Sequence, residues 1–261
     1  MKSFQAKNVV VTGASSGIGE AFANQFAELG ANLLLVARSE GALLQLAKNL
    51  KEKFSMQCDV IAMDLSEDNA AKKLFDRANS MNWDIDILVN NAGFGKIGDF
   101  EQYDWQTYHS MLQLNINTLT ELCLLYLPSM KKKNSGGIIN VASTAAFLPI
   151  PFSSVYAASK SYVLHFSESL FGELLKTNVT VTCLCPSRTK TKFAKAANSP
   201  FPDYESRAYD TPENSARVGI QGFLKRKNTV ISGHQKLLVS LVPRIFSRSR
   251  VVKLTSTQYK K

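Results

Sequence analysis

Long apolar runs and regularly spaced cysteines are both missing from this sequence of 261 residues. No apolar run reaches the ~18 residues that a membrane-spanning helix needs, so we expect no transmembrane segment. Only Met1–Lys7 precede the first expected strand, which leaves no room for a signal peptide and predicts a cytoplasmic protein. The four cysteines are too few and too irregular for a disulfide framework or a zinc site. Cys183 and Cys185 instead belong on one face of a buried strand, and we expect no metal site.

Acidic residues are absent from the C-terminal part of the chain. The formal net charge is +10, and no Asp or Glu follows Glu213, whereas eleven Lys and Arg residues do. We therefore divide the chain into a dinucleotide-binding and catalytic domain, residues 1–235, and a basic amphipathic extension, residues 236–261. We expect the extension either to form a helix pair packed on the body or on a partner subunit, or to make a peripheral contact with an anionic membrane. Nucleic-acid binding is not expected, because few aromatic residues lie among the cations and no known binding motif accompanies them.

Short apolar runs alternate with longer amphipathic segments along the chain. This alternation predicts an α/β fold, a Rossmann-type doubly wound parallel sheet flanked by helices in a single domain. Strands are expected at residues 8–12, 33–36, up to 63–65, 85–89, 138–141, 179–186 and 229–232. The longer expected helices cover residues 66–81, 105–131, 153–176 and 212–225. The stretch 187–211 lacks periodicity and is interpreted as a mobile loop or lid.

A glycine-rich turn follows the first expected strand. The absence of side chains at its three glycines lets the backbone turn tightly and approach a pyrophosphate at the positive end of a helix. The cofactor-binding residues expected in this turn are Gly13, Ser15, Ser16, Gly17, Ile18 and Gly19. Arg38 ends the second strand, where an acidic residue would select NAD, and an arginine there suits the 2′-phosphate of NADP(H). Asp64 is placed either to contact the adenine edge or to cap the following helix.

Tyr156 and Lys160 are four residues apart and therefore share one face of a helix. An ammonium about 5 Å from a phenol, at an effective dielectric constant of ~20, stabilises the phenolate by roughly 3 kcal/mol. That energy corresponds to about two pKa units. The spacing therefore indicates a tyrosine that can act as an acid or base closer to neutral pH.

The glycine turn at 12–19, Asn-Asn-Ala-Gly at 90–93, Asn115, Ser143 and Tyr156-x-x-x-Lys160 occur in the order and spacing of one family. The chain resembles the classical short-chain dehydrogenase/reductase family over residues 6–235. The resemblance implies that Tyr156 exchanges a proton with the reacting oxygen while Ser143 orients that oxygen. It implies that Lys160 lowers the pKa of the phenol and holds the nicotinamide ribose, and that Asn115 binds a water of a proton relay.

The same resemblance implies further cofactor contacts and an assembly. The implied contacts are Leu65, Asn91, Ala92, Gly93, Pro186 and Thr189, besides Tyr156 and Lys160. It also implies a homodimer or homotetramer built on the helices near 105–131 and 153–176. Ser187 stands where the family usually has glycine, and a left-handed backbone there would be strained.

Apolar residues flank the expected carbonyl site. Phe94 and Phe147 are interpreted as substrate-binding residues beside Ser143 and Tyr156, although Phe147 could equally pack in the core. We therefore expect an NADP(H)-dependent oxidoreductase that reduces a lipophilic carbonyl compound. The alternatives are a 3-oxoacyl thioester (ACP or CoA) reductase and, from another class, a non-catalytic protein that senses NADP(H) or acts as a scaffold.

Overall fold

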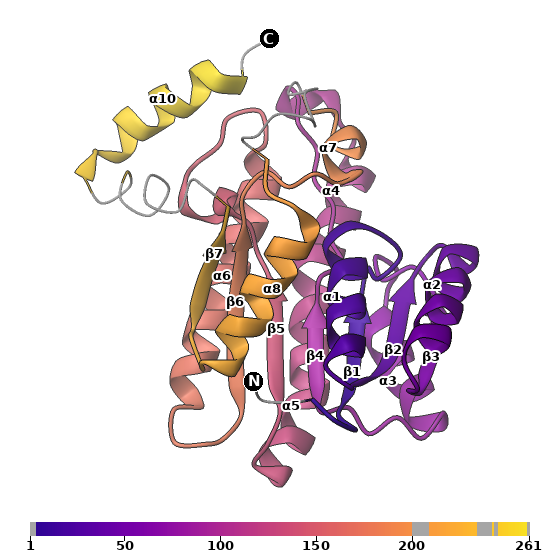
Figure 1. Ribbon diagram of the computed structural model, residues 1–261. Helices are drawn as coiled ribbons and strands as arrows, with labels where there is room; N and C mark the ends of the chain where they lie inside the picture. Colours follow the sequence, from indigo (N-terminus) through magenta and orange to yellow (C-terminus); the bar gives the residue numbers. More distant parts are fainter. Residues whose placement is uncertain (1–3, 200–208, 234–241, 243–244, 260–261) are drawn as a thin grey trace.

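Seven parallel strands form one sheet at the centre of the molecule (Figure 1). The computed structural model describes residues 4–199, 209–233, 242 and 245–259. The strand order is β3-β2-β1-β4-β5-β6-β7. The strands are β1 Asn8–Thr12, β2 Asn32–Ala37, β3 Cys58–Ala62, β4 Ile87–Asn90, β5 Gly137–Val141, β6 Thr180–Pro186 and β7 Thr229–Ser232. This arrangement confirms the predicted Rossmann-type fold.

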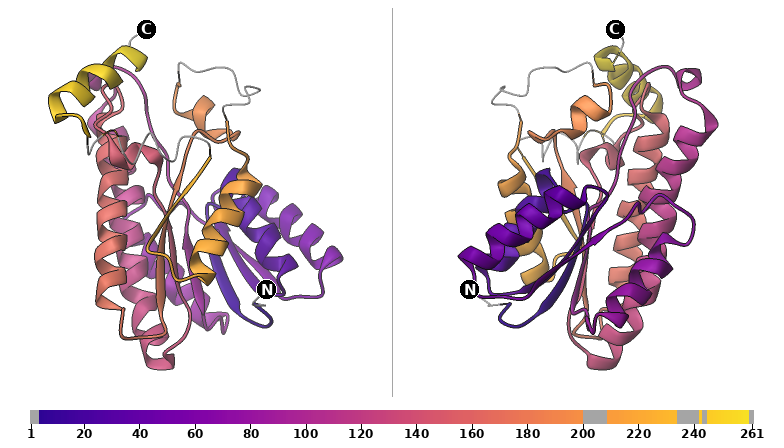
Figure 2. Two further views of the ribbon diagram at one scale, coloured as in Figure 1. Left: turned by 60° about the vertical axis from the view of Figure 1, so that its left-hand side comes forward. Right: turned by 90° about the vertical axis from the view of Figure 1, so that its right-hand side faces the viewer.

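Helices cover both faces of the sheet, so the strands are apolar on both sides (Figure 2). One layer consists of α1 Gly17–Glu28, α2 Glu40–Lys53 and α8 Pro212–Leu224. The other layer consists of α3 Ala70–Ser80, α5 Leu119–Lys133 and α6 Ser154–Glu173. Phe22 and Phe26 of α1 are fully buried in the first layer, and Leu74 of α3 and Leu122 of α5 are buried in the second. The apolar sides of these amphipathic helices thus face the sheet.

Successive strands are added in one direction from β1 to β3 and in the opposite direction from β4 to β7, and β1 and β4 lie side by side and parallel where this order changes. The connection after β1 leads to α1 on one face, whereas the connection after β4 leads toward α5 on the other face. In open parallel sheets such a reversal leaves a crevice at the carboxyl ends of the strands, where ligands bind. The crevice is therefore expected beside Thr12 and Asn90.

Several elements differ from their predicted form. The single helix expected over 105–131 is α4 Trp105–Leu112, a π-helical segment η2 Gln113–Thr118, and α5. Strand β3 ends at Ala62 rather than near residues 63–65, and α3 begins only after Asn69, whose φ of 58° is left-handed. The segment 187–211 contains a short helix, α7 Phe193–Ala196, and a bridge between Thr189 and Asp210. Residues 200–208 of that segment lie outside the described residues.

The basic extension contains one described helix, α10 Arg248–Tyr259. The first helix of the predicted pair falls on residues outside the description, apart from residue 242. Two short 3-10 turns, η1 Phe100–Gln102 and η3 Thr144–Phe147, complete the described elements.

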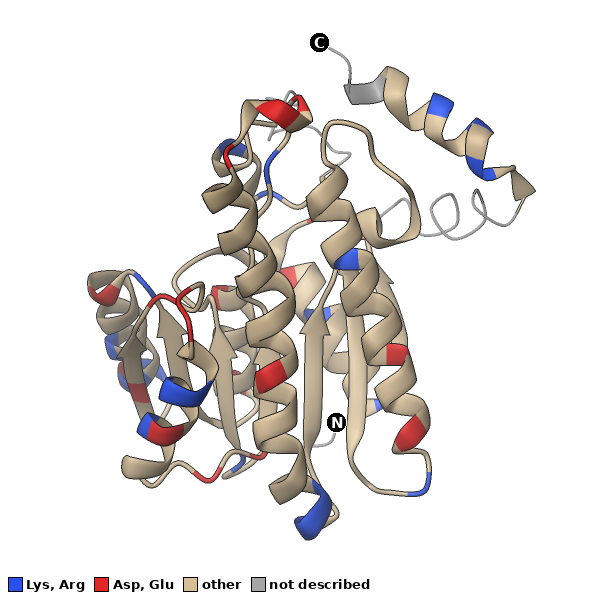
Figure 3. Cartoon of the chain, turned by 180° about the vertical axis from the view of Figure 1, so that it is seen from behind, with Lys and Arg blue, Asp and Glu red and all other residues tan. Residues whose placement is uncertain are grey.

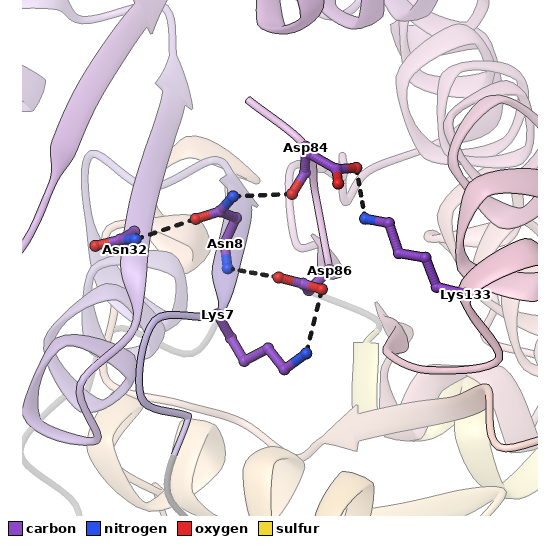
Figure 4. Close-up of polar contacts among 6 residues, drawn as sticks. All are labelled: Lys7, Asn8, Asn32, Asp84, Asp86 and Lys133. Atoms are coloured by element: carbon purple, nitrogen blue, oxygen red, sulfur yellow. Dashed lines mark hydrogen bonds and ion pairs between the residues drawn. The ribbon is translucent and has the colours of Figure 1, made fainter. Parts of the chain in front are cut away.

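A polar network ties the amino ends of the strands together, at the end of the sheet away from the crevice (Figure 4). The Asp86 carboxylate accepts from the Asn8 backbone N–H at 3.0 Å and pairs with the Lys7 ammonium at 3.4 Å. The Asn8 amide donates to the Asp84 carbonyl at 2.9 Å and accepts from Asn32 at 3.1 Å. These contacts join β1, β2 and the turn before β4 outside the apolar core.

Within the described residues, no helix is long and apolar enough to cross a membrane. The described part of the chain also holds no group of three or more His, Cys, Asp or Glu that could bind a metal ion. Cys183 and Cys185 lie on one buried face of β6 with their sulfurs 3.9 Å apart, as predicted.

Candidate active site

The glycine turn joins β1 to the amino end of α1. Gly13 has a φ of 65°, which side chains disfavour, and a Cβ on Gly19 would overlap the Gly13 carbonyl oxygen. Ser16 occupies the N-cap position of α1, and its side chain makes no capping hydrogen bond. The first N–H groups of the helix are therefore left without a side-chain cap, which is the arrangement that binds a phosphate.

Thr12 and Asn91 stabilise this turn through hydrogen bonds. The Thr12 hydroxyl accepts from the backbone N–H groups of Asn91 and Ala92, both at 3.0 Å, and donates to the Val89 carbonyl at 3.2 Å. The Asn91 amide donates to the carbonyls of Thr12 at 2.9 Å and Gly13 at 3.2 Å. The Asn91 side-chain nitrogen and backbone N–H therefore support the turn, and contact between Asn91 and the cofactor stays a prediction. Thr12 was part of the motif but had no predicted role.

Arg38 and Asp64 meet at the carboxyl ends of β2 and β3. Arg38 Nη1 lies 3.6 Å from Asp64 Oδ2, and the Arg38 side chain is 77% exposed. Partial burial acts to raise the pKa of Asp64, but hydrogen bonds from Ser66 and the charge of Arg38 together lower it. Asp64 thus remains ionised and orients the guanidinium, which is the more exposed of the two groups, since the Asp64 side chain is 31% exposed. Its Oδ1 accepts from the Ser66 N–H at 2.9 Å, but the N-cap of the following helix α3 is Asn69, so Asp64 does not cap that helix as its alternative role required.

Lys160 lies on α6 and is buried, with an exposed fraction of 4%. Its ammonium donates to the Val141 carbonyl at 2.9 Å and lies 5.9 Å from the centroid of the Tyr156 ring. Burial lowers the pKa of Lys160 from 10.5 to about 8, and the nearby thiols of Cys183 and Cys185 oppose this shift only in part. The two residues therefore share one face of α6 as the spacing predicts, with the ammonium beneath the ring.

The Tyr156 ring is held between two groups that the sequence did not single out. A Cβ on Gly95 would lie 2.7 Å from Tyr156 Cδ2, so the Gly95 backbone packs directly on the ring. The Phe193 ring of α7 lies 5.5 Å from the Tyr156 ring, centroid to centroid. Phe193 was missed because a single four-residue helix leaves no periodic signal in the sequence.

Asn115 is buried in the π-helical segment η2. Its Oδ1 accepts from the Phe94 N–H at 3.2 Å, and its Nδ2 lies 2.9 Å from the Phe94 carbonyl and 3.1 Å from Ser159 Oγ. A Cβ on Gly93 would lie 2.9 Å from Asn115 Oδ1 and 3.3 Å from Lys160 Nζ. The Asn115 side chain thus clamps the Phe94 backbone and lies next to the ammonium, and π-helical turns of this kind often occur at functional sites.

Ser143 lies at the carboxyl end of β5, as the N-cap of η3. Its Oγ accepts from the Ala145 N–H at 3.1 Å, and the residue is half-buried. The Ser161 hydroxyl lies 2.8 Å from the Ala146 carbonyl and ties η3 to α6, which carries Tyr156. Phe147 packs against the core on the α6 side of the sheet, as in the alternative given for it.

The residues after β6 are arranged without the strain that Ser187 could have caused. Ser187 is not among the residues with a positive φ, and its N–H donates to the Ser232 carbonyl at 3.3 Å. Its hydroxyl is buried and has no hydrogen-bond partner among the described groups. A Cβ on Gly233 would overlap this hydroxyl, so the two residues fit each other. Thr189 is buried, and its Oγ1 donates to the Ser187 carbonyl at 2.9 Å.

Known proteins resemble this chain in sequence and in fold. A family described as short chain dehydrogenase matches residues 7–200. The very-long-chain 3-oxoacyl-CoA reductase of Mus musculus is 31% identical over 245 residues, which are 90% of this chain and 75% of that protein. The solved short-chain dehydrogenase from Sphingobium yanoikuyae in complex with NADPH is 30% identical, with a TM-score of 0.80 over 86% of this chain and 87% of that one. A short chain dehydrogenase/reductase from Burkholderia phymatum in complex with NAD is 25% identical, with a TM-score of 0.81 over 98% and 97%.

Proposed function

Because the chain belongs to the short-chain dehydrogenase family of oxidoreductases, which act on alcohols and carbonyl groups, we propose that it reduces lipophilic carbonyl compounds with NADPH. The observation that carries the proposal is the buried ammonium of Lys160 beneath the Tyr156 ring, on the helix against which η3 packs, the turn that Ser143 caps. A buried cation next to an ionisable phenol is the arrangement that tunes an acid/base group.

The residues at the sheet crevice fit a nicotinamide dinucleotide. The uncapped amino end of α1 and the tight glycine turn suit the pyrophosphate. The exposed guanidinium of Arg38, at the end of β2, suits a 2′-phosphate and is the reason for proposing NADP(H) rather than NAD(H). When bound there, the nicotinamide ring supplies or accepts the hydride.

The chain's own residues would then transfer the proton and orient the substrate. The Tyr156 phenol donates its proton to the substrate oxygen in reduction, because the ammonium beneath it stabilises the phenolate that remains. The Ser143 hydroxyl donates a hydrogen bond to the same oxygen and fixes its position. Asn115 acts through its hold on Phe94 and its place beside Lys160, where a water of the proton relay would bind.

The substrate class follows from the side chains next to Tyr156. Phe193 contacts the Tyr156 ring, and Asn115 holds the backbone of the half-buried Phe94, which precedes Gly95 in the chain. Aromatic walls favour a lipophilic ketone, aldehyde or secondary alcohol over a charged metabolite. A second candidate is a 3-oxoacyl thioester reductase, and the name and 31% identity of the mouse relative favour it.

The test follows absorbance at 340 nm during oxidation of NADPH or NADH with aliphatic, aromatic, steroidal and 3-oxoacyl carbonyl compounds. We expect turnover with NADPH that Tyr156→Phe reduces by about a hundredfold or more, the usual scale for a general acid. NADPH binding, followed separately by fluorescence, should remain in that variant. Binding without turnover on any substrate would favour the NADP(H)-sensing alternative, and turnover of only the 3-oxoacyl compounds would favour the second candidate.

The role of Arg38 has its own measurement. Arg38→Ala should weaken NADPH binding by about tenfold or more, the effect of losing a charged hydrogen bond, and leave NADH binding nearly unchanged. Lys48→Ala is the matched control, because that side chain is also exposed and its ion pair with Glu52 lies on α2. Equal losses for both cofactors would contradict the assignment of the 2′-phosphate to Arg38.

A further inference from the structure

Helix α10 is attached to the part of the molecule that carries the proposed catalytic residues. Among residues 248–257 of this helix, whose burial is described, Val251 and Thr255 are buried, with exposed fractions of 2% and 8%. The Thr255 hydroxyl lies 2.9 Å from the carbonyl oxygen of Pro149. Pro149 belongs to the loop between Ser143 and Tyr156, so α10 rests on the connection between two residues of the proposed site. Figures 1 and 2 both place α10 at the carboxyl end of the sheet.

The surface of α10 away from this contact is basic. Arg250 and Lys253 lie on the opposite side of the helix from Val251 and Thr255, because positions three and four apart share a face. Both are exposed; Arg248 in the first turn is exposed too, but it lies three residues before Val251 and so on that side of the helix. Figure 3 shows blue positions and no red one on α10. No acidic residue follows Glu213, so no carboxylate within the extension neutralises these charges.

Apolar side chains accompany the cations. Ile245 and Phe246, just before α10, are 70% and 41% exposed, and Leu254 within it is 53% exposed. Cations alone would suit any anionic ligand. The large exposed apolar groups lie close to the cations in the chain. Moving such groups out of water lowers the free energy, and an anionic ligand alone would not bury them.

We propose that α10 and the preceding Ile245 and Phe246, which we call the basic docking surface, bind an anionic phospholipid membrane. The cations contact the headgroups, and Ile245 and Phe246 enter the boundary of the acyl chains. The contact with Pro149 then holds the proposed active site close to the lipid, where lipophilic carbonyl compounds accumulate. This last step rests on the proposed function, whereas membrane binding itself does not. A soluble acidic protein partner is the competing occupant of this surface, and the experiment below includes it as an outcome.

The experiment uses the full chain and vesicles of phosphatidylcholine, alone or mixed with phosphatidylserine, in a flotation assay. We expect binding to the mixed vesicles only, weakened by added salt. Arg250→Glu with Lys253→Glu should lower the partition coefficient by about tenfold or more, because each cation near a charged membrane contributes separately. Ile245→Ser with Phe246→Ser should lower it several-fold at unchanged charge.

The matched control makes an equal change in net charge at the opposite end of the molecule. Lys131→Glu with Lys132→Glu alters two exposed lysines at the end of α5 and should leave vesicle binding intact. Absence of binding to the mixed vesicles, or equal losses in both charge-reversed proteins, would overturn the proposal. So would capture of an acidic acyl carrier protein by the wild type without any vesicle binding. Reduction of a water-soluble carbonyl compound by every variant, measured in parallel, separates a failure of docking from a failure of the proposed function.

Discussion

At the scale of single residues, Lys160 couples the proposed chemistry to stability. Its burial lowers its pKa from 10.5 to about 8, so between these values the unfolded chain binds the proton and the native protein does not. The stability contributed at this residue therefore rises with pH from about 8 to 10.5. Below this window the buried charge costs on the order of 3 kcal/mol. Lys160→Met should thus be more stable than the wild type at neutral pH, and the difference should shrink as the pH increases. Urea unfolding of both proteins between pH 7 and 10.5 measures this difference in unfolding free energy. A difference that stays constant with pH would contradict the prediction.

Ser187 offers a second test at the same scale. Its buried hydroxyl has no partner among the described groups, and a buried unsatisfied group costs free energy. Ser187→Ala keeps the Cβ and removes this hydroxyl, so we expect the free energy of unfolding to rise by about 1 kcal/mol. Gly233→Ala is the opposing control, because its Cβ would overlap the hydroxyl and its φ is 86°. A loss of stability in Ser187→Ala would mean that the hydroxyl bonds a group not described.

At the scale of elements, the polar network at the amino ends of the strands can be tested apart from the active site. Asp86→Ala leaves the Asn8 N–H without its acceptor and removes the Lys7 pair, so we expect a loss of about 1–3 kcal/mol in unfolding free energy. Asp84→Ala removes only an ion pair with Lys133 in which the Asp84 side chain is 69% exposed, and should cost less than about 1 kcal/mol. Carbonyl reduction should persist in both folded variants. Similar losses in the two proteins, measured by urea titration, would contradict the ranking.

The elements also show which parts of the structure the sequence could predict. The continuous apolar run Val9–Val11 predicted β1, because a parallel strand is covered on both faces. The four-residue spacing of Tyr156 and Lys160 predicted that they share one face of a helix. The π-helical segment η2 could not be predicted from the sequence, because its spacing of apolar residues differs little from that of an α-helix. Phe152 has a φ of 63°, a backbone state that depends on tertiary contacts, such as the hydrogen bond from Gly98, rather than on local preference. The closure of Phe193 and Gly95 around Tyr156 likewise depends on three segments that meet only in the fold.

At the scale of the whole molecule, α5 and α6 present exposed apolar side chains on the outer layer. Leu124 of α5 is 70% exposed and Tyr162 of α6 is 39% exposed, and Thr120 joins the two helices through a hydrogen bond to Tyr162 at 3.0 Å. Figure 3 shows few charged positions along these helices. A surface of this kind is typical of an interface with another copy of the chain, the homodimer or homotetramer expected from the sequence.

Leu124→Glu should therefore shift the protein to a smaller assembly, because a carboxylate buried in such an interface lacks a partner. Light scattering after size-exclusion chromatography measures the mass over a range of concentrations. Leu44→Glu is the matched control, because Leu44 is 53% exposed but lies on α2, in the helical layer on the other face of the sheet. An unchanged mass in Leu124→Glu, or a fall in both variants, would place the contact elsewhere. Since α10 lies at the carboxyl end of the sheet while Leu124 lies along its side, the smaller assembly should still bind anionic vesicles, which separates self-association from membrane docking.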